Sequence, residues 1–228
     1  MNCDFSIKHY QEILKLALKS GFVITNFRDL DKVKKHPKII ILRHDIDALP
    51  VRYLALAKIE KSLGIKATYF VRVHGQYYYP SDKKTLKIFK EILKMGHEIG
   101  LHSEARSLSK VFQSPEIDLF KSEKTYLEEI LGVKIESASE HGDLGRRTDF
   151  WQDHFFKKVP KKTVGIKHYP QEFKEFKYLS DSLSSWKEGC PCQNLEKFNK
   201  LQVLVHAEWW GKGAKQEMVK LNKEYAKI

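Results

Sequence analysis

The sequence predicts a single-domain α/β barrel built on a parallel sheet, and three observations lead to it. Short apolar runs typical of buried strands alternate with helix-like stretches along most of the chain. Three helical stretches end in a glycine that the next strand follows at once, in Leu63-Gly64-Ile65, Met95-Gly96-His97 and Leu131-Gly132-Val133. Histidine or an acidic residue comes directly after nearly every strand. Such alternation indicates right-handed βα units, whose polar strand ends meet on one face as in barrel enzymes.

Length and composition agree with one soluble domain. With 228 residues, 42% of them hydrophobic, the chain can bury one large core. We expect an N-terminal helix and lead-in over residues 1–37 and the barrel over residues 38–228. The net charge of +12 favours an acidic partner. Because the lysines are dispersed along helix faces, we interpret them as a solvated surface and expect no nucleic-acid partner.

The first elements are an amphipathic helix over residues 6–20 and a short strand at Phe22-Val23-Ile24. A polar loop leads from there into Lys38–Asp47, where four apolar residues in a row predict a strand buried on both faces. Further helices are expected from Pro50, Lys83 and Pro115.

Later parts of the chain are less regular. Residues 145–177, with Arg146, Arg147 and Trp151, suggest a helix and a loop, and Val164-Gly165-Ile166 is a candidate strand. Residues 212–228 predict a lysine-rich helix.

Three cysteines, Cys3, Cys190 and Cys192, argue against a disulfide framework. Cys190-Pro191-Cys192 alone supplies too few ligands for a structural zinc site. The first residues lack a signal-peptide pattern, and no apolar run reaches the ~20 residues of a membrane span. We therefore expect a cytoplasmic protein without a membrane span.

The strand Lys38–Asp47 ends in Arg43-His44-Asp45-Ile46-Asp47. Two carboxylates two residues apart, beside a histidine, suit a divalent metal or an acid/base pair. Alternatively, Asp47 caps a helix that begins near Pro50. The other strand ends carry Arg72 and His74, His102-Ser103-Glu104, Ser139-Glu140-His141-Gly142-Asp143, Ser180-Asp181-Ser182, and His206-Ala207-Glu208-Trp209-Trp210.

These strand ends resemble the polysaccharide deacetylases of carbohydrate esterase family four, which have the NodB-homology domain. Arg43–Asp47 looks like their first motif, and Gly96-His97-Glu98-Ile99-Gly100-Leu101-His102-Ser103 is very similar to their second. Glu140-His141-Gly142, Asp181 with Trp186, and Leu204-Val205-His206 stand where the third, fourth and fifth motifs are expected. The resemblance covers roughly residues 38–210, and it implies a distorted (β/α)7-type barrel that removes acetyl groups from sugars with a divalent metal, usually zinc.

The resemblance further implies Asp45 as general base, Asp47 and His102 as metal ligands, and His206 as the catalytic acid. The sequence departs from the family in two places. Arg106 stands where the second motif carries a further ligand histidine, and the first motif has Asp-x-Asp in place of adjacent aspartates. The roles of Asp45 and Asp47 are therefore exchangeable.

A guanidinium cannot replace the missing ligand, because it has no lone pair to give. His141, at a strand end, is the candidate third ligand, and His44 is the reserve. Asp181 either caps a turn or orients the base or the acid. Trp209 and Trp210 are either core residues or contacts to the substrate, for which Arg72 is a further candidate.

We thus expect a zinc-dependent hydrolase that removes an N-acyl group, most often acetyl, from an amino sugar or sugar polymer. A subgroup with similar Arg-His-Asp-x-Asp and His-x-Glu-Trp-Trp ends occurs in surface-polysaccharide biosynthesis. The substrate would be an acetylated sugar, a nucleotide sugar or a glycan. Two alternatives are an inactive relative that binds glycans or nucleotide sugars, and a basic module for anionic polymers.

Overall fold

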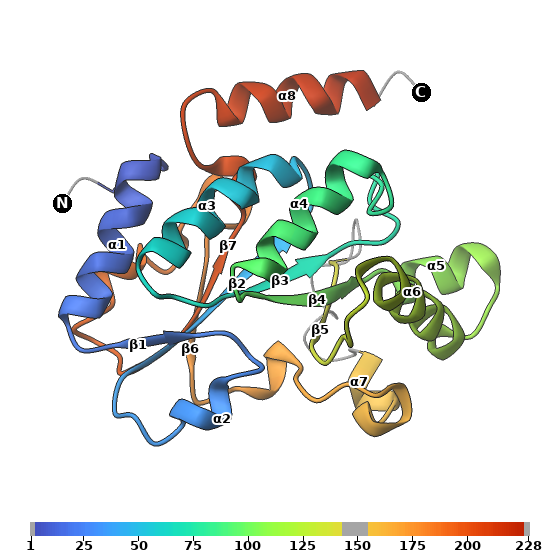
Figure 1. The fold of residues 1–228 in the computed structure, drawn as a ribbon, viewed down its shortest axis with the longest axis horizontal. Coiled ribbons are helices and arrows are strands. Elements are labelled where there is room, and N and C mark those ends of the chain that lie inside the picture. Colours follow the sequence, from blue (N-terminus) through green and yellow to red (C-terminus); the bar gives the residue numbers. More distant parts are fainter. Residues whose placement is uncertain (1–2, 143–154, 226–228) are drawn as a thin grey trace.

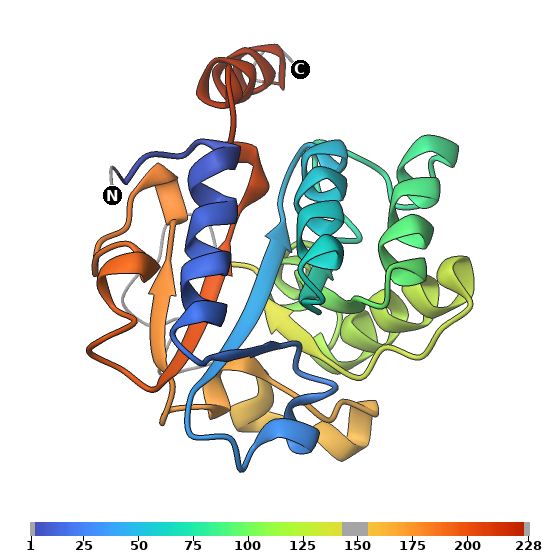
Figure 2. The same cartoon turned by 60° about the vertical axis from the view of Figure 1, so that its left-hand side comes forward.

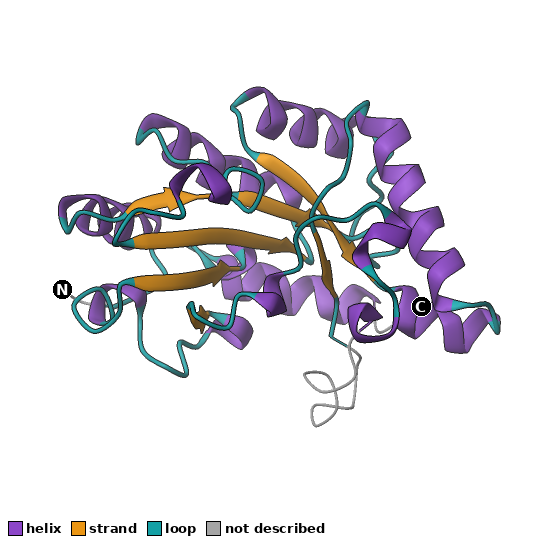
Figure 3. Ribbon diagram, turned by 90° about the horizontal axis from the view of Figure 1, so that it is seen from below, coloured by secondary structure: helices purple, strands orange, loops and turns teal. Residues whose placement is uncertain are grey.

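The computed structural model describes residues 3–142 and 155–225. Within them the chain forms one parallel seven-stranded sheet with helices packed around it. The strand arrows point towards the same end of the molecule (Figure 3). The strands are β1 (Val23–Thr25), β2 (Ile39–Ile46), β3 (Thr68–Val71), β4 (Glu98–Ser103), β5 (Ala138–Glu140), β6 (Lys177–Ser180) and β7 (Lys200–Val205).

Helices alternate with these strands (Figure 1). They are α1 (Ile7–Lys19), α2 (Leu30–Val33), α3 (Pro50–Ser62), α4 (Lys83–Lys94), α5 (Ala105–Phe112), α6 (Glu116–Leu131), α7 (Phe155–Lys158) and α8 (Ala214–Tyr225). Figure 2 shows α1 and α3 on the same side of the sheet. Gly64, Gly96 and Gly132 end α3, α4 and α6 with φ of +72°, +93° and +69°. This left-handed conformation favours glycine, so the glycine-punctuated alternation is confirmed.

The sheet runs in the order β5-β4-β3-β2-β7-β6, and β1 pairs with the first half of β2 beside β3. The sheet curls into a half-barrel. Among the described strands, β5 and β6 form its two ends and are not paired with each other. The α/β class, the single domain and the distorted barrel of about seven strands are therefore confirmed. The curled sheet gives the site a concave face.

All eight residues of β2 are buried, and their side chains alternate between two faces. Ile40 and Leu42 pack in the large core that includes α1 and α3, whereas Ile39 and Ile41 pack in a smaller cluster with Phe70. Arg43 continues this second row, with its guanidinium 5.0 Å from the Phe70 ring centroid. The period-two alternation therefore places Arg43, Asp45 and Asp47 in line on the concave face.

The buried carboxylate of Glu60 connects α1, α3, β2 and β3 through polar contacts. Glu60 of α3 accepts hydrogen bonds from Tyr10 of α1 at 2.5 Å and Tyr69 of β3 at 2.7 Å, and it lies 2.9 Å from His44 Nε2 of β2. Burial would raise the pKa of Glu60, but His44, His97 and the hydrogen bond from Tyr10 together lower it to about 2. The network fixes the strand from which the site's aspartates project.

Two local predictions were wrong. Val164-Gly165-Ile166 is no strand, because residues Lys161–Val164 form a 3₁₀ turn and Gly165 follows with φ of +68°. The strand that was expected to end just before Ser139 instead runs over Ala138–Glu140. The predicted helix around Arg146, Arg147 and Trp151 lies outside the described residues. In the described part of the chain, every helix is too short or too polar to span a bilayer.

Candidate active site

The carboxyl ends of six neighbouring strands meet around the concave face. Each carries at least one of the residues that sequence analysis singled out, and strand order fixes their order in space. From β5 across to β6 they are His141, His102, Arg72, Asp45 with Asp47, His206 and Asp181.

Asp47, His102 and His141 form a compact cluster in which one candidate ligand atom from each lies within 4.8 Å of the others. Asp47 Oδ1 is 3.6 Å from His102 Nε2 and 3.7 Å from His141 Nε2. The two imidazole rings stand nearly perpendicular, with centroids 5.2 Å apart. The predicted convergence of these three side chains is therefore confirmed.

The cluster fits a divalent cation. Asp47 Oδ1 is buried, and no hydrogen-bond partner for it exists among the described residues. An unsatisfied buried carboxylate oxygen is costly, and a cation would satisfy it. His102 Nδ1 lies 2.8 Å from the Ser139 hydroxyl, so Nε2 is the nitrogen left to face Asp47. Burial lowers the pKa of both His102 and His141 to about 4, which keeps them neutral and able to donate a lone pair.

Asp45 lies beside this cluster and is held by Arg43. The guanidinium donates two hydrogen bonds, Nε to Oδ1 at 3.1 Å and Nη2 to Oδ2 at 2.5 Å. Both side chains are buried. Burial would raise the pKa of Asp45, but the charges and hydrogen bonds around it, those of Arg43 foremost, lower it to about 2. Asp45 is thus a fixed carboxylate, with Oδ2 3.6 Å from His102 Nε2.

His206 lies near the other carboxylate oxygen of Asp47, with its Nε2 3.9 Å from Oδ2. Its Nδ1 lies 2.6 Å from Asp181 Oδ1, and its backbone N–H donates to both Asp181 oxygens at 3.0 Å. Trp210 Nε1 donates to Asp181 Oδ2 at 2.7 Å. Although burial disfavours the imidazolium, Asp181 raises the pKa of His206 to about 10. Asp181 therefore orients His206 and keeps it protonated.

Arg72 is held inside the site. Its Nη2 donates to Glu104 at 2.5 Å, and its Nη1 lies 3.8 Å from Asp47 Oδ1. Only 11% of its side chain is exposed. Arg72 therefore balances the negative charges of Glu104 and Asp47. Its contact to a substrate stays a prediction.

Three other expectations need correction. Trp210 is 1% exposed and packs against Phe5 and Tyr10, so it is a core residue and not a substrate contact. His44, the reserve ligand, is fully buried on the opposite face of β2, between the Val205 carbonyl and Glu60. Asp47 does not cap α3, whose first flanking residue is Leu49, with φ of +51° and no side-chain cap bond.

Two more site residues went without a role in the sequence analysis. Arg43 lies two residues before Asp45, and the period of two along a strand was the signal that places both on one face. Glu208 lies two residues after His206 and accepts a hydrogen bond from Tyr53, which also donates to the Asp45 carbonyl. Burial raises the pKa of Glu208 to about 8. No sequence pattern signalled that burial.

The sequence matches no protein-family model and no curated protein. Solved structures do match. The chitin deacetylase of the fungal pathogen Colletotrichum lindemuthianum is 15% identical, with a TM-score of 0.50, and the match covers 82% of each chain. The polysaccharide deacetylase Bc1974 from Bacillus cereus is 14% identical, with a TM-score of 0.50, over 83% of this chain and 89% of that one.

A third similar structure is a mutant of BA3943, a CE4 family pseudoenzyme from Bacillus anthracis, with restored enzymatic activity. It is 16% identical, with a TM-score of 0.50, over 83% of this chain and 65% of its own. At such identities the likeness establishes the fold. The chain has the fold of the CE4 polysaccharide deacetylases, which active enzymes and a pseudoenzyme share.

Proposed function

We propose that this protein is a metal-dependent hydrolase that removes an acetyl or other N-acyl group from an amino sugar or a sugar polymer. One observation carries the proposal. Asp47, His102 and His141 meet around a buried carboxylate oxygen without a hydrogen bond, between an Arg43-bound Asp45 and an Asp181-bound His206. A ligand cluster between a fixed carboxylate and a protonated imidazole suits acyl-group hydrolysis.

Asp47, His102 and His141 would hold the cation, for which zinc is our proposal because two imidazoles and one carboxylate are a common catalytic zinc set. When bound, the cation supplies Lewis-acid polarisation of the acyl carbonyl.

Asp45 would orient the attacking water and accept its proton. Arg43 binds both carboxylate oxygens and helps to keep Asp45 ionised at neutral pH. His206 would protonate the departing amine from Nε2, since Nδ1 is engaged by Asp181. The raised pKa of His206 provides that proton at neutral and mildly alkaline pH.

The substrate is proposed to be an acetylated sugar, a nucleotide sugar or a glycan, in surface-polysaccharide biosynthesis and in the cytoplasm. The proposed substrate and pathway rest on the strand-end motifs of the sequence. Trp209 is half-buried beside His206 and remains a candidate for contact with a sugar ring.

The proposal is tested by acetate release from a panel of acetylated amino sugars, their polymers and nucleotide sugars. Asp45→Asn should abolish release, because an amide cannot accept the proton from water. Asp31→Asn removes a carboxylate from an exposed ion pair with Lys34 and should leave the rate unchanged. Circular dichroism checks that both variants fold. An unchanged rate in Asp45→Asn would refute the role of this residue.

A second candidate function is binding of glycans or nucleotide sugars without hydrolysis. Arg106, in the first turn of α5, stands where the resemblance calls for a second histidine, and a pseudoenzyme shares the fold. This alternative predicts saturable binding of an acetylated sugar in calorimetry without acetate release at any metal concentration.

A further inference from the structure

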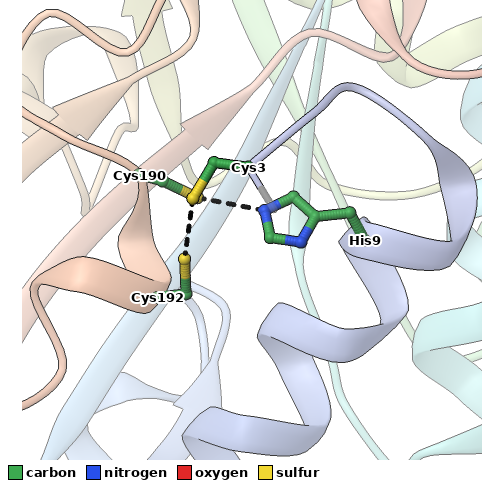
Figure 4. Close-up of side chains that lie close together, drawn as sticks. All are labelled: Cys3, His9, Cys190 and Cys192. Atoms are coloured by element: carbon green, nitrogen blue, oxygen red, sulfur yellow. Dashed lines mark hydrogen bonds between the residues drawn. The ribbon is translucent and has the colours of Figure 1, made fainter. Parts of the chain in front are cut away.

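A second cluster of metal-binding side chains lies away from the concave face. All three cysteines of the chain meet His9 there, as Figure 4 shows. Cys3 precedes α1 and His9 is in its first turn, whereas Cys190 and Cys192 belong to the connection between β6 and β7. The two halves are 189 residues apart in sequence, measured from Cys3 to Cys192.

The four side chains point at one another. Cys3 Sγ lies 3.4 Å from Cys192 Sγ, and His9 Nε2 lies 3.3 Å from Cys190 Sγ. All four candidate ligand atoms lie within 4.8 Å of one another. In a tetrahedral site with Zn–S bonds of ~2.3 Å, neighbouring sulfurs are roughly 3.8 Å apart. The cluster is therefore close to the size that a tetrahedral ion requires.

The surroundings of His9 point to a ligand independently of the sulfurs. His9 is 2% exposed, and its Nδ1 is a buried atom without a hydrogen bond among the described residues. The nearest acid is Glu12, whose Oε2 is 3.8 Å from that nitrogen. Histidine ligands of metals usually present their second nitrogen to a carboxylate or carbonyl. With Nε2 on a metal, Nδ1 would carry the proton and face Glu12.

The loop that carries the other two ligands is also ordered. Asn194 Nδ2 donates to the carbonyls of Glu188, Gly189 and Cys190 at 3.2, 3.3 and 3.0 Å. Cys190 itself is 2% exposed. Its thiol is thus held towards His9 before any ion binds.

We propose that Cys3, His9, Cys190 and Cys192 form a structural zinc site that is separate from the Asp47–His102–His141 cluster. Three sulfurs and one imidazole nitrogen are a common structural zinc set and leave no open position for a substrate. The expectation that Cys190 and Cys192 were too few ligands was incomplete, because the fold brings in Cys3 and His9.

The ion would clamp the segment before α1 to the β6–β7 connection. It would also support the acid side of the active site. The His9 ring stacks on Trp210 with centroids 6.4 Å apart, and Trp210 donates to Asp181, which holds His206. The proposal does not depend on the hydrolase activity.

The test is zinc content per chain, measured by plasma mass spectrometry on protein purified without chelator. Cys3→Ser and Cys192→Ser should each lose one zinc equivalent relative to the parent protein, whereas His102→Ala should keep that equivalent. Because Cys3 is exposed, Cys3→Ser tests the site without disturbing the core. Glu12→Gln should retain the zinc but release it faster to a chelator.

Cobalt substitution gives a readout that is independent of counting. The parent protein and His102→Ala should show a thiolate-to-cobalt charge-transfer band, and Cys192→Ser should show a weakened one. Zinc should also protect the thiols from alkylation. Unchanged zinc content in both cysteine variants, or a disulfide between Cys3 and Cys192 in freshly purified protein, would overturn the proposal.

Discussion

Asp181→Asn is the most direct test of how His206, the proposed catalytic acid, is kept protonated. The substitution keeps the shape of the side chain and leaves an amide oxygen able to accept from Trp210 Nε1, but it removes the negative charge beside His206. Asp181 is the main cause that raises the pKa of His206 from 6.5 to about 10, while burial acts in the opposite direction. Asp47 acts in the same direction but contributes less than Asp181.

The expected magnitude follows from the two pKa values. At pH 8 a histidine with a pKa near 10 is almost fully protonated, whereas one with its ordinary value of ~6.5 is only about 3% protonated. Burial without Asp181 would push the pKa lower still, so the loss of acid at pH 8 is at least about 30-fold. The alkaline limb of kcat/KM should move down by roughly 3 pH units.

The assay is the pH dependence of acetate release by the parent protein and by Asp181→Asn, together with the His206 ring titration followed by NMR. Ser182→Ala, at the neighbouring exposed residue, is the matched control and should leave both unchanged. An Asp181→Asn profile with its alkaline limb in place, or a His206 that still titrates near 10, would refute the assignment of Asp181.

Three further outcomes are expected. Glu60→Gln should lower the free energy of unfolding by about 3 kcal/mol and Tm by roughly 6–12 °C in calorimetry, and Glu224→Gln, in an exposed pair with Lys220, by less than about 0.5 kcal/mol. Because the folded-state pKa of Glu60 is depressed, its contribution should be complete above pH 4.5 and lost as the pH falls towards 2 in acid unfolding. His141→Ala should weaken cation binding at the Asp47 cluster by at least roughly 100-fold in chelator competition, whereas the exposed His74→Ala should not. Trp210→Phe should cost about 1.5–3 kcal/mol of stability through the lost bond to Asp181; a rise in KM with unchanged stability would restore Trp210 as a substrate contact.

The strand ends were predictable because a parallel sheet converts a local pattern into a spatial one. An apolar run followed by Asp45 or His102 identifies both the strand and its exit, and the shared direction of the strands then brings these exits together. Side chains alternate between the two faces of β2, so Arg43 and Asp45 lie on one face and His44 on the other. The sequence predicts this alternation, but only the structure shows which face borders the site.

Contacts between distant segments could not be obtained in that way. Trp210 is buried because Phe5 and Tyr10 pack against it, and no pattern near Trp210 encodes those partners. The same holds for Cys190 and Cys192, whose neighbours Cys3 and His9 lie at the other end of the chain. Residues 164–166 show that a local pattern can also mislead a secondary-structure prediction. Their apolar-glycine-apolar pattern suits a strand, but Gly165 at φ of +68° ends a 3₁₀ turn.

Acetate release with and without a divalent cation tests the proposed hydrolase most directly. The protein is stripped with a chelator, assayed against acetylated amino sugars, their polymers and nucleotide sugars, and assayed again after zinc is returned. We expect one substrate class to yield acetate and free amine in equal amounts, only with the cation present and not in Asp45→Asn. Tight binding of an acetylated sugar without acetate release under any of these conditions would contradict a hydrolase and favour the binding protein.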